Sequence, residues 1–225
     1  MTREKVRARI EEIGIIPAIR LSSAPDAIFA AEAVSSHGIP IVEVTMTVPG
    51  ALDVIKELVR NDPKLIVGAG SVFGVQMARQ CVEAGAMFLT SPGLDLDVVN
   101  VAQQNDVVTF PGALTPTEIT AACKAGVDFV KVFPCSQLGG PSYIRALKSP
   151  FPHMPLIASG GVNQQTAGDF ILAGAAALGI GRDLIQPNAI ELREKAWIHE
   201  LSRRFLSIVK QARAQMRDGE TPSAC

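Results

Sequence analysis

Short apolar runs alternate with amphipathic stretches along most of the chain. The runs are rich in β-branched and small apolar residues and are bounded by glycine, proline or polar residues. There are eight of them, at 15–19, 41–46, 64–69, 87–91, 106–110, 128–133, 155–159 and 176–180. Between the runs, apolar residues recur at helical spacing, as at Ala27, Ala30, Ala31 and Val34. Strands that are apolar on both faces and joined by helices are typical of a parallel sheet.

This count of strand–helix units predicts a single (β/α)₈ TIM barrel over about residues 14–185, with an N-terminal helix before it. The alternative is a doubly wound sheet, but the G-x-G-x-x-G turn expected after its first strand is missing, and IRLSSAPD stands there instead. Residues 190–213 predict one long amphipathic C-terminal helix, which we expect to pack on the barrel or on a neighbouring subunit. The residues after 213 are expected to form a frayed tail, and residues 1–225 to form one domain.

Composition and charge narrow the possible partners. The chain has 21 basic and 22 acidic residues, which are interspersed, so nucleic acid and membrane surfaces are not expected as partners. The longest apolar runs are far shorter than a bilayer span, and the amphipathic start MTREKVRARIEEIGI has no signal-peptide core. We therefore expect a cytoplasmic protein that acts on a small molecule.

Cysteine and histidine give no support for a metal site or another cofactor. The chain contains four cysteines, Cys81, Cys123, Cys135 and Cys225, and three histidines, His37, His153 and His199. None of them has the spacing of metal ligands, and we interpret the cysteines as reduced thiols.

Two ionisable residues lie within predicted strands rather than beyond them. Glu43 alternates with valines in the second strand, and Lys131 alternates with valines in the sixth. One interpretation is a buried ion pair across the barrel interior, although desolvation makes such pairs poor stabilisers. The other is catalysis, because a lysine that loses its proton in an apolar setting can attack a ketone and form a Schiff base. A neighbouring carboxylate would then move protons, as in a class I aldolase.

Other polar and glycine residues follow the strands, where the chemistry of a barrel is located. Gly160, Gly161 and Gly181 follow the seventh and eighth strands, where backbone N–H groups suit a phosphate, although tight turns alone would also explain them. Arg20 and Ser71 are candidates for binding a carboxylate; the alternatives are a surface arginine and a helix cap.

Six motifs, in this order and spacing, resemble the 2-keto-3-deoxy-6-phosphogluconate (KDPG) and 4-hydroxy-2-oxoglutarate (KHG) aldolase family. They are IVEVTMT, VGAGSV, SPG, FPGALTPTE, FVKVFP and ASGGV. The resemblance covers about residues 5–185. It implies a small (β/α)₈ barrel, usually a homotrimer, that needs no metal or organic cofactor and cleaves the sugar acid to pyruvate and glyceraldehyde 3-phosphate.

The resemblance also implies roles for individual residues. Lys131 matches the Schiff-base lysine, and Glu43 matches the acid/base that moves protons through a water molecule. Ser71 stands where a threonine usually contacts the pyruvyl carboxylate. The remaining matches are Pro92 and Phe133 in the apolar wall around the pyruvyl group and Gly160, Gly161 and Gly181 at the phosphate end. Independently of the resemblance, Thr45 and Thr47 are also expected beside the substrate, because the second strand of the barrel carries them.

Two positions depart from the family pattern. Thr47 stands where many members have an arginine that binds the substrate carboxylate, and we expect Arg20 to supply the guanidinium instead. Arg182 stands where a small residue often lies near the phosphate, so the specificity for the distal end of the substrate is left open. The alternatives are a pyruvate aldolase for KHG, the galactonate epimer or an unphosphorylated sugar acid, and a non-catalytic barrel that binds a phosphorylated sugar acid.

Overall fold

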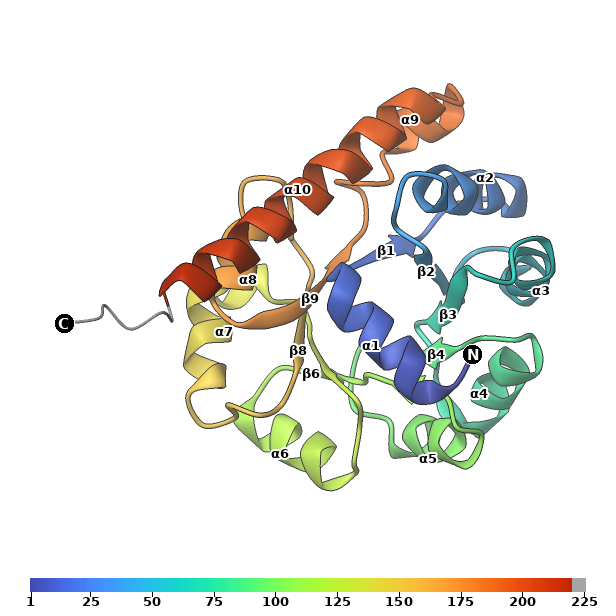
Figure 1. Ribbon diagram of the computed structural model, residues 1–225. Helices are drawn as coiled ribbons and strands as arrows, with labels where there is room; N and C mark the ends of the chain where they lie inside the picture. The colour runs from blue at the N-terminus through green and yellow to red at the C-terminus, as the bar shows by residue number, and fades with distance from the viewer. Residues whose placement is uncertain (220–225) are drawn as a thin grey trace.

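The computed structural model describes residues 1–219 and shows one parallel sheet that curls into a barrel inside a ring of helices (Figure 1). Its strands are β1 (Ile15–Ile19), β2 (Ile41–Thr45), β3 (Ile66–Gly70), β4 (Phe88–Leu89), β5 (Val108–Thr109), β6 (Gly112–Ala113), β7 (Val130–Val132), β8 (Leu156–Ser159) and β9 (Ala175–Ile180). They lie in the order β5-β4-β3-β2-β1-β9-β8-β7-β6, and every neighbouring pair is parallel. The predicted barrel is confirmed.

The run predicted as a fifth strand is shorter than expected and is followed by a separate strand. β5 and β6 lie on either side of Phe110 and Pro111, and proline has no N–H for a ladder hydrogen bond. These two strands are the two ends of the sheet order, so the chain itself closes the barrel between them. Hydrogen bonds complete the closure: Asp128 N–H donates to the carbonyl of Thr109 at 3.1 Å, and Lys131 N–H donates to that of Pro111 at 2.9 Å.

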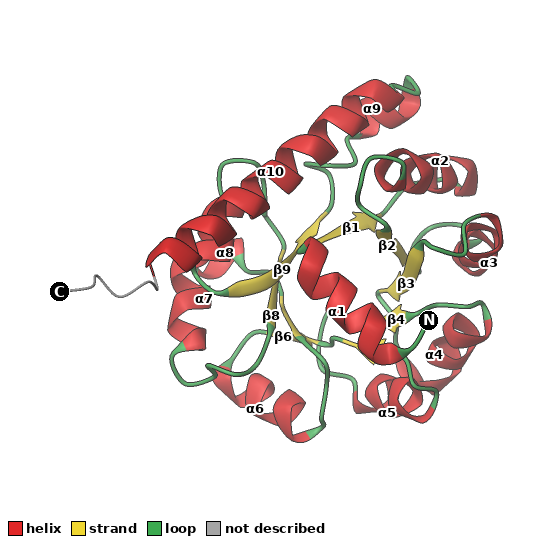
Figure 2. Cartoon of the chain, viewed as in Figure 1, coloured by secondary structure: helices red, strands yellow, loops and turns green. Residues whose placement is uncertain are grey.

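Helices cover the outside of the barrel and one of its ends (Figure 2). They are α1 (Arg3–Ile13), α2 (Ala24–Ser35), α3 (Ala51–Asn61), α4 (Gly74–Glu83), α5 (Leu96–Gln104), α6 (Pro116–Lys124), α7 (Pro141–Lys148), α8 (Ala167–Leu172), α9 (Pro187–Glu191) and α10 (Lys195–Gly219), with a 3₁₀ turn at Ser136–Leu138. The start of α6 carries a capping box made by Thr115 and Glu118.

Side chains alternate between the barrel interior and the surrounding helices, as the pleat requires. Val130 and Val132 of β7 belong to the cluster between the sheet and the helices, whereas Phe129 belongs to the interior cluster. That interior cluster also contains Val6 and Ile10, so α1 closes the N-terminal end of the barrel. Only the end formed by the carboxyl ends of the strands is left for a substrate.

The C-terminal helical region differs from its prediction at both ends. A break separates α9 from α10 at Arg193, whose φ is 53°, and the N–H groups of Arg193 and Glu194 donate back to Ile190 and Ala189. This is a Schellman-type helix end with an arginine in place of the usual glycine. An ion pair with Asp26 at 2.7 Å holds Arg193 there. The predicted end at 213 is wrong, because α10 continues to Gly219; the rest of the predicted tail, including Cys225, lies outside the described residues.

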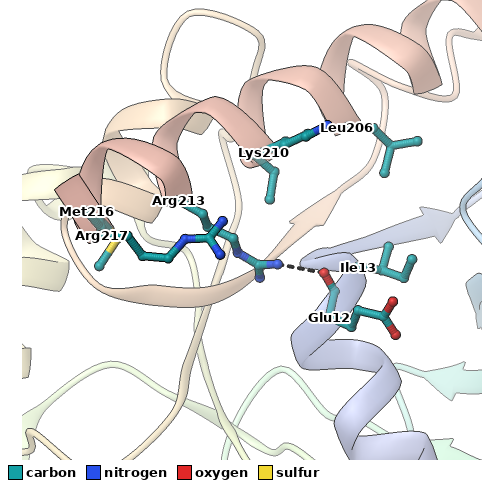
Figure 3. Close-up of a pocket in the computed structure, with 8 residues that line it drawn as sticks. Glu12, Ile13, Leu206, Lys210, Arg213, Met216 and Arg217 are labelled. Atoms are coloured by element: carbon teal, nitrogen blue, oxygen red, sulfur yellow. Dashed lines mark hydrogen bonds between the residues drawn. The ribbon is translucent and has the colours of Figure 1, made fainter.

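Arg213 connects α10 to α1 and to the start of β9 (Figure 3). Its guanidinium donates to the carbonyls of Glu11, Glu12 and Ala176 at 2.6 to 2.9 Å. The contact satisfies carbonyls at the end of α1, and it leaves no room for a side chain at Gly14, whose added Cβ would lie 2.5 Å from Nη2. These hydrogen bonds fix α1, which closes the N-terminal end of the barrel, against α10 and β9.

Within residues 1–219, no helix is both long and apolar enough to cross a membrane. The cytoplasmic location stays a prediction.

Substituting Gly168 tests the packing of α8 against α10. Gly168 lies inside α8 without a left-handed φ, and an added Cβ would meet Ile208 Cγ2 at 3.5 Å, an ordinary contact. We expect Gly168→Ala to raise the free energy of unfolding by about 0.5–1 kcal/mol, because alanine loses less backbone entropy in a helix. Urea unfolding measures the change, and a destabilised variant would show that the contact between the two helices is tighter than described.

Candidate active site

A cavity of about 390 Å³ opens at the carboxyl ends of the strands. Its lining residues are Ala18, Arg20, Glu43, Ser71, Pro92, Lys131, Phe133, Ser159, Gly160, Gly161, Val162, Gly179, Gly181, Arg182 and Asp183. All the predicted site residues except Thr45 and Thr47 are among them. A larger cavity, of about 700 Å³, lies between α1 and α10, but no strand end contributes to it.

Lys131 and Glu43 meet across the interior of the barrel. Lys131 Nζ lies 3.6 Å from Glu43 Oε2, and the two side chains are only 11% and 4% exposed. Their strands, β7 and β2, are separated in the sheet by β8, β9 and β1, so the contact exists only because the sheet is closed. The structure therefore gives the predicted pairing of a buried amine with a carboxylate that can exchange protons with it.

An apolar wall stands beside the amine. The ring of Phe133, two residues after Lys131 on the same face of the chain, has its centroid 5.7 Å from Nζ. Pro92, in the loop after β4, also lines the cavity, and its backbone rests against Gly112, where an added Cβ would be 2.0 Å from the Pro92 carbonyl oxygen. The glycine after Pro111 thus lets the loop after β4 approach the mouth of the cavity.

Arg20 and Ser71 lie together at the ends of β1 and β3. Arg20 Nη2 donates to Ser71 Oγ over a long 3.4 Å, and the contact is exposed, so both groups are accessible to a ligand. Ser71 has a φ of 58°, a left-handed conformation that is strained for a residue other than glycine. Strained residues concentrate at binding sites, and this one brings a hydroxyl beside a guanidinium, a suitable pair for a carboxylate.

The other end of the cavity combines backbone N–H groups with charge. Gly160 and Gly161 both have left-handed φ values, and Gly161 leaves space for Ser136 Oγ, which would lie 2.0 Å from an added Cβ. A helical turn begins at Gly181, whose carbonyl accepts from the N–H groups of Leu184 and Ile185. An anion is favoured at such a turn.

Arg182 and Asp183 give this distal end both a cation and an acid. Arg182 is exposed and lines the cavity from the same turn. Burial is the main cause that raises the pKa of Asp183 above its ordinary value, with its own backbone N–H acting in the opposite direction. Asp183 is one of the lining residues that the prediction missed, together with Ala18, Ser159, Val162 and Gly179. Ser159 and Gly179 stand at strand ends and were recognisable there; no sequence pattern marks Asp183.

Thr45 and Thr47 are not brought to the cavity. Thr45 is fully buried, and its hydroxyl donates to the carbonyl of Ile19 at 3.0 Å and contacts the hydroxyl of Thr47 at 2.8 Å. Thr45 thus joins β2 to β1. A contact between Thr45 and the substrate stays a prediction, and the structure shows the hydroxyl engaged by the neighbouring strand.

Among the described residues, no three His, Cys, Asp or Glu side chains come together as possible metal ligands. The cavity instead contains a buried amine, a carboxylate 3.6 Å from it and two places suited to anions.

Comparison with known proteins agrees with this arrangement. The family model described as KDPG and KHG aldolase matches residues 6–201. The chain belongs to the KDPG and KHG aldolase family. Its relatives include the 2-dehydro-3-deoxy-phosphogluconate aldolase of Pseudomonas aeruginosa, which is 30% identical over 90% of this chain and 94% of the relative.

Solved structures superpose closely on the chain. The KDPG aldolase of Legionella pneumophila, with pyruvate captured as a covalent carbinolamine intermediate, has a TM-score of 0.81 at 28% identity and covers 87% of this chain and 95% of its own. A cube-shaped protein cage designed by fusing symmetric oligomeric domains has a TM-score of 0.84 at 26% identity, with 93% and 76% covered.

The strain at Ser71 is testable by comparing two variants that both lack the hydroxyl. Ser71→Gly removes the cost of a left-handed φ, whereas Ser71→Ala keeps it. We expect Ser71→Gly to be more stable than Ser71→Ala by about 1 kcal/mol in the free energy of unfolding. Equal stabilities in denaturant unfolding would show that the left-handed conformation carries no strain.

Proposed function

We propose that this protein is a class I aldolase that cleaves 2-keto-3-deoxy-6-phosphogluconate to pyruvate and glyceraldehyde 3-phosphate. The contact between Lys131 Nζ and Glu43 Oε2, at 3.6 Å inside a cavity with anion-binding groups at both ends, carries the proposal. Membership of the aldolase family and the covalent pyruvate intermediate in the Legionella pneumophila relative support it.

The reaction follows from the chemistry of these two groups. The uncharged amine of Lys131 adds to the C2 ketone, and loss of water from the carbinolamine gives a protonated Schiff base. Glu43 accepts the proton of the C4 hydroxyl, directly or through a water molecule, as the C3–C4 bond breaks. The electron pair of that bond passes into the iminium, so the aldehyde departs and an enamine of pyruvate remains. Protonation at C3 and hydrolysis release pyruvate and regenerate Lys131.

The two ends of the cavity suit the two charged ends of the substrate. Arg20 and Ser71 bind the C1 carboxylate, and Pro92 and Phe133 enclose the pyruvyl carbons. The phosphate lies at Gly160, Gly161 and Gly181, where backbone N–H groups and Arg182 face it. Arg20 thereby takes the place of the arginine that is absent at position 47.

One observation favours a second substrate, KHG. Arg182 supplies a guanidinium at the distal end, which suits a carboxylate as well as a phosphate. The family model includes KHG aldolases. Comparing kcat/KM for KDPG, its galactonate epimer, the unphosphorylated sugar acid and KHG decides between these substrates, and the largest value identifies the preferred distal group.

The oligomeric state also belongs to this proposal. We propose a homotrimer, which the resemblance implies and the similar cage of fused oligomeric domains supports. Phe73 and Leu96 are 55% and 53% exposed. Phe73 lies two residues after Ser71, which lines the cavity, and Leu96 begins α5 after the loop that starts at the lining residue Pro92. An exposed apolar surface of this kind is suited to contact between subunits. Sedimentation equilibrium at the monomer mass would refute the trimer.

Reductive trapping tests the nucleophile. Incubation with pyruvate and borohydride should leave one reduced pyruvyl adduct on Lys131, found by peptide mass spectrometry. Lys131→Arg retains a positive charge but has no amine that forms a Schiff base, so cleavage should fall by several orders of magnitude, at least about 10³-fold. A binding protein without activity would give no adduct in the wild type, and an adduct on another lysine would reassign the nucleophile.

Arg20→Ala tests the carboxylate site. Loss of a charged contact is expected to weaken binding of the substrate by about 2–4 kcal/mol, which raises KM strongly. Steady-state kinetics measure the change, with Arg20→Lys as the variant that keeps the charge. The loss of a charged contact changes KM by far more than about twofold. A KM within about twofold of the wild-type value would therefore show that Arg20 does not contact the substrate.

A further inference from the structure

The interior face of β3 carries no side chain at two successive inward positions. Gly68 and Gly70 both point into the barrel, in register with Glu43 and Thr45 of the neighbouring β2. Neither has a left-handed φ, so an alanine would fit the backbone at both. The reason for glycine at these positions therefore lies in what occupies the space beside them.

Each of these glycines makes room for a different group. An added Cβ at Gly68 would lie 2.1 Å from the ring of Phe88, which fills the lower interior of the barrel. An added Cβ at Gly70 would lie 2.0 Å from Glu43 Oε1, 2.5 Å from Cδ and 2.7 Å from Cγ. Glu43 is in register with Gly68, where the Phe88 ring fills the space. The Glu43 side chain therefore extends away from that ring along the barrel axis, and its carboxylate lies over Gly70.

The second carboxylate oxygen faces the amine. With Oε1 over Gly70, Oε2 lies 3.6 Å from Lys131 Nζ. Two further contacts fix the surroundings: the carbonyl of Gly70 accepts from Met46 N–H at 2.8 Å, and the hydroxyl of Thr45 is turned toward the carbonyl of Ile19 on the opposite side of β2. The space over Gly70 is therefore left to Glu43.

We propose that Gly70 is a positioning residue, and that its missing side chain provides the space that holds the Glu43 carboxylate against the amine of Lys131. The inference rests on the proposed aldolase reaction for its catalytic consequence. A methyl group at position 70 overlaps three atoms of the glutamate, so the carboxylate has to leave this position. Because it is the free end of a flexible side chain, it can move without unfolding the barrel.

Activity and Schiff-base formation are expected to respond differently to Gly70→Ala. A misplaced proton-transfer group lowers kcat by on the order of 10²-fold, since displacement by about 1 Å has effects of this size. Exchange of the methyl protons of pyruvate with deuterium oxide, followed by NMR, should slow by a similar factor. KM should change by less than about threefold, which is less than the loss of one charged contact with the substrate would cause. Prolonged trapping with pyruvate and borohydride should still label Lys131.

A double-mutant cycle separates positioning from a general effect on structure. If Gly70 acts through Glu43, Gly70→Ala should have almost no further effect on kcat in a Glu43→Gln background. Any loss of melting temperature in Gly70→Ala should be recovered when Glu43→Ala removes the overlapping side chain. Gly168→Ala, a glycine-to-alanine change on the outer face of the barrel, serves as the matched control and should leave kcat unchanged.

Three results would overturn the inference. They are a Gly70→Ala enzyme with kcat within threefold of the wild type, an equal loss of kcat in the Glu43→Gln background, and a loss of stability that Glu43→Ala does not recover. Failure of the aldolase proposal looks different, because the wild type would then neither exchange the pyruvate protons nor give an adduct on Lys131. The melting-temperature comparison with Glu43→Ala needs no substrate, so it tests the positioning role of Gly70 even if the aldolase proposal fails.

Discussion

The contact between Lys131 and Glu43 links the fold to the chemistry. Removing two charged groups from water costs several kcal/mol each, and a contact at 3.6 Å recovers only part of that. The two residues stand on strands that are not neighbours in the sheet, so neither local sequence nor strand pairing brings them together. Closure of the barrel brings them together. This closure depends on the interrupted strand around Pro111, where β5 pairs with β4 on one side and β6 pairs with β7 on the other.

How far the sequence predicts this arrangement depends on the range of the interactions involved. The strand at 15–19 is predicted with its observed bounds, and the capping box at Thr115 is present, because both depend on neighbours along the chain. The pairing of Lys131 with Glu43 was predictable as well, since an inward-facing charge in an apolar strand needs a partner. The break at Arg193 was not, because the signal for such a helix end is glycine, and here an ion pair from α2 holds the conformation instead.

The features of the cavity that the sequence did not reveal have a similar cause. Period-two alternation correctly places Thr45 on the same face as Glu43, but it does not reveal that the hydroxyl is engaged by the β1 backbone. Asp183 was missed because its place in the cavity depends on the turn that begins at Gly181, not on a motif. Alternation thus predicts which face a residue occupies, whereas its contacts depend on neighbouring strands and loops.

The two ends of the barrel are built for different purposes. At the N-terminal end, α1 inserts Val6 and Ile10 among the interior aromatic residues, Arg3 pairs with the buried Asp128 at 3.0 Å, and Arg213 ties α1 to α10. At the carboxyl ends of the strands, Ser71 and the glycines after β8 adopt left-handed conformations, and two ionisable side chains are buried. Such local costs persist only where the surrounding structure maintains them. The closed end supplies that support through its packing, so the amine and the carboxylate are held 3.6 Å apart at the open end.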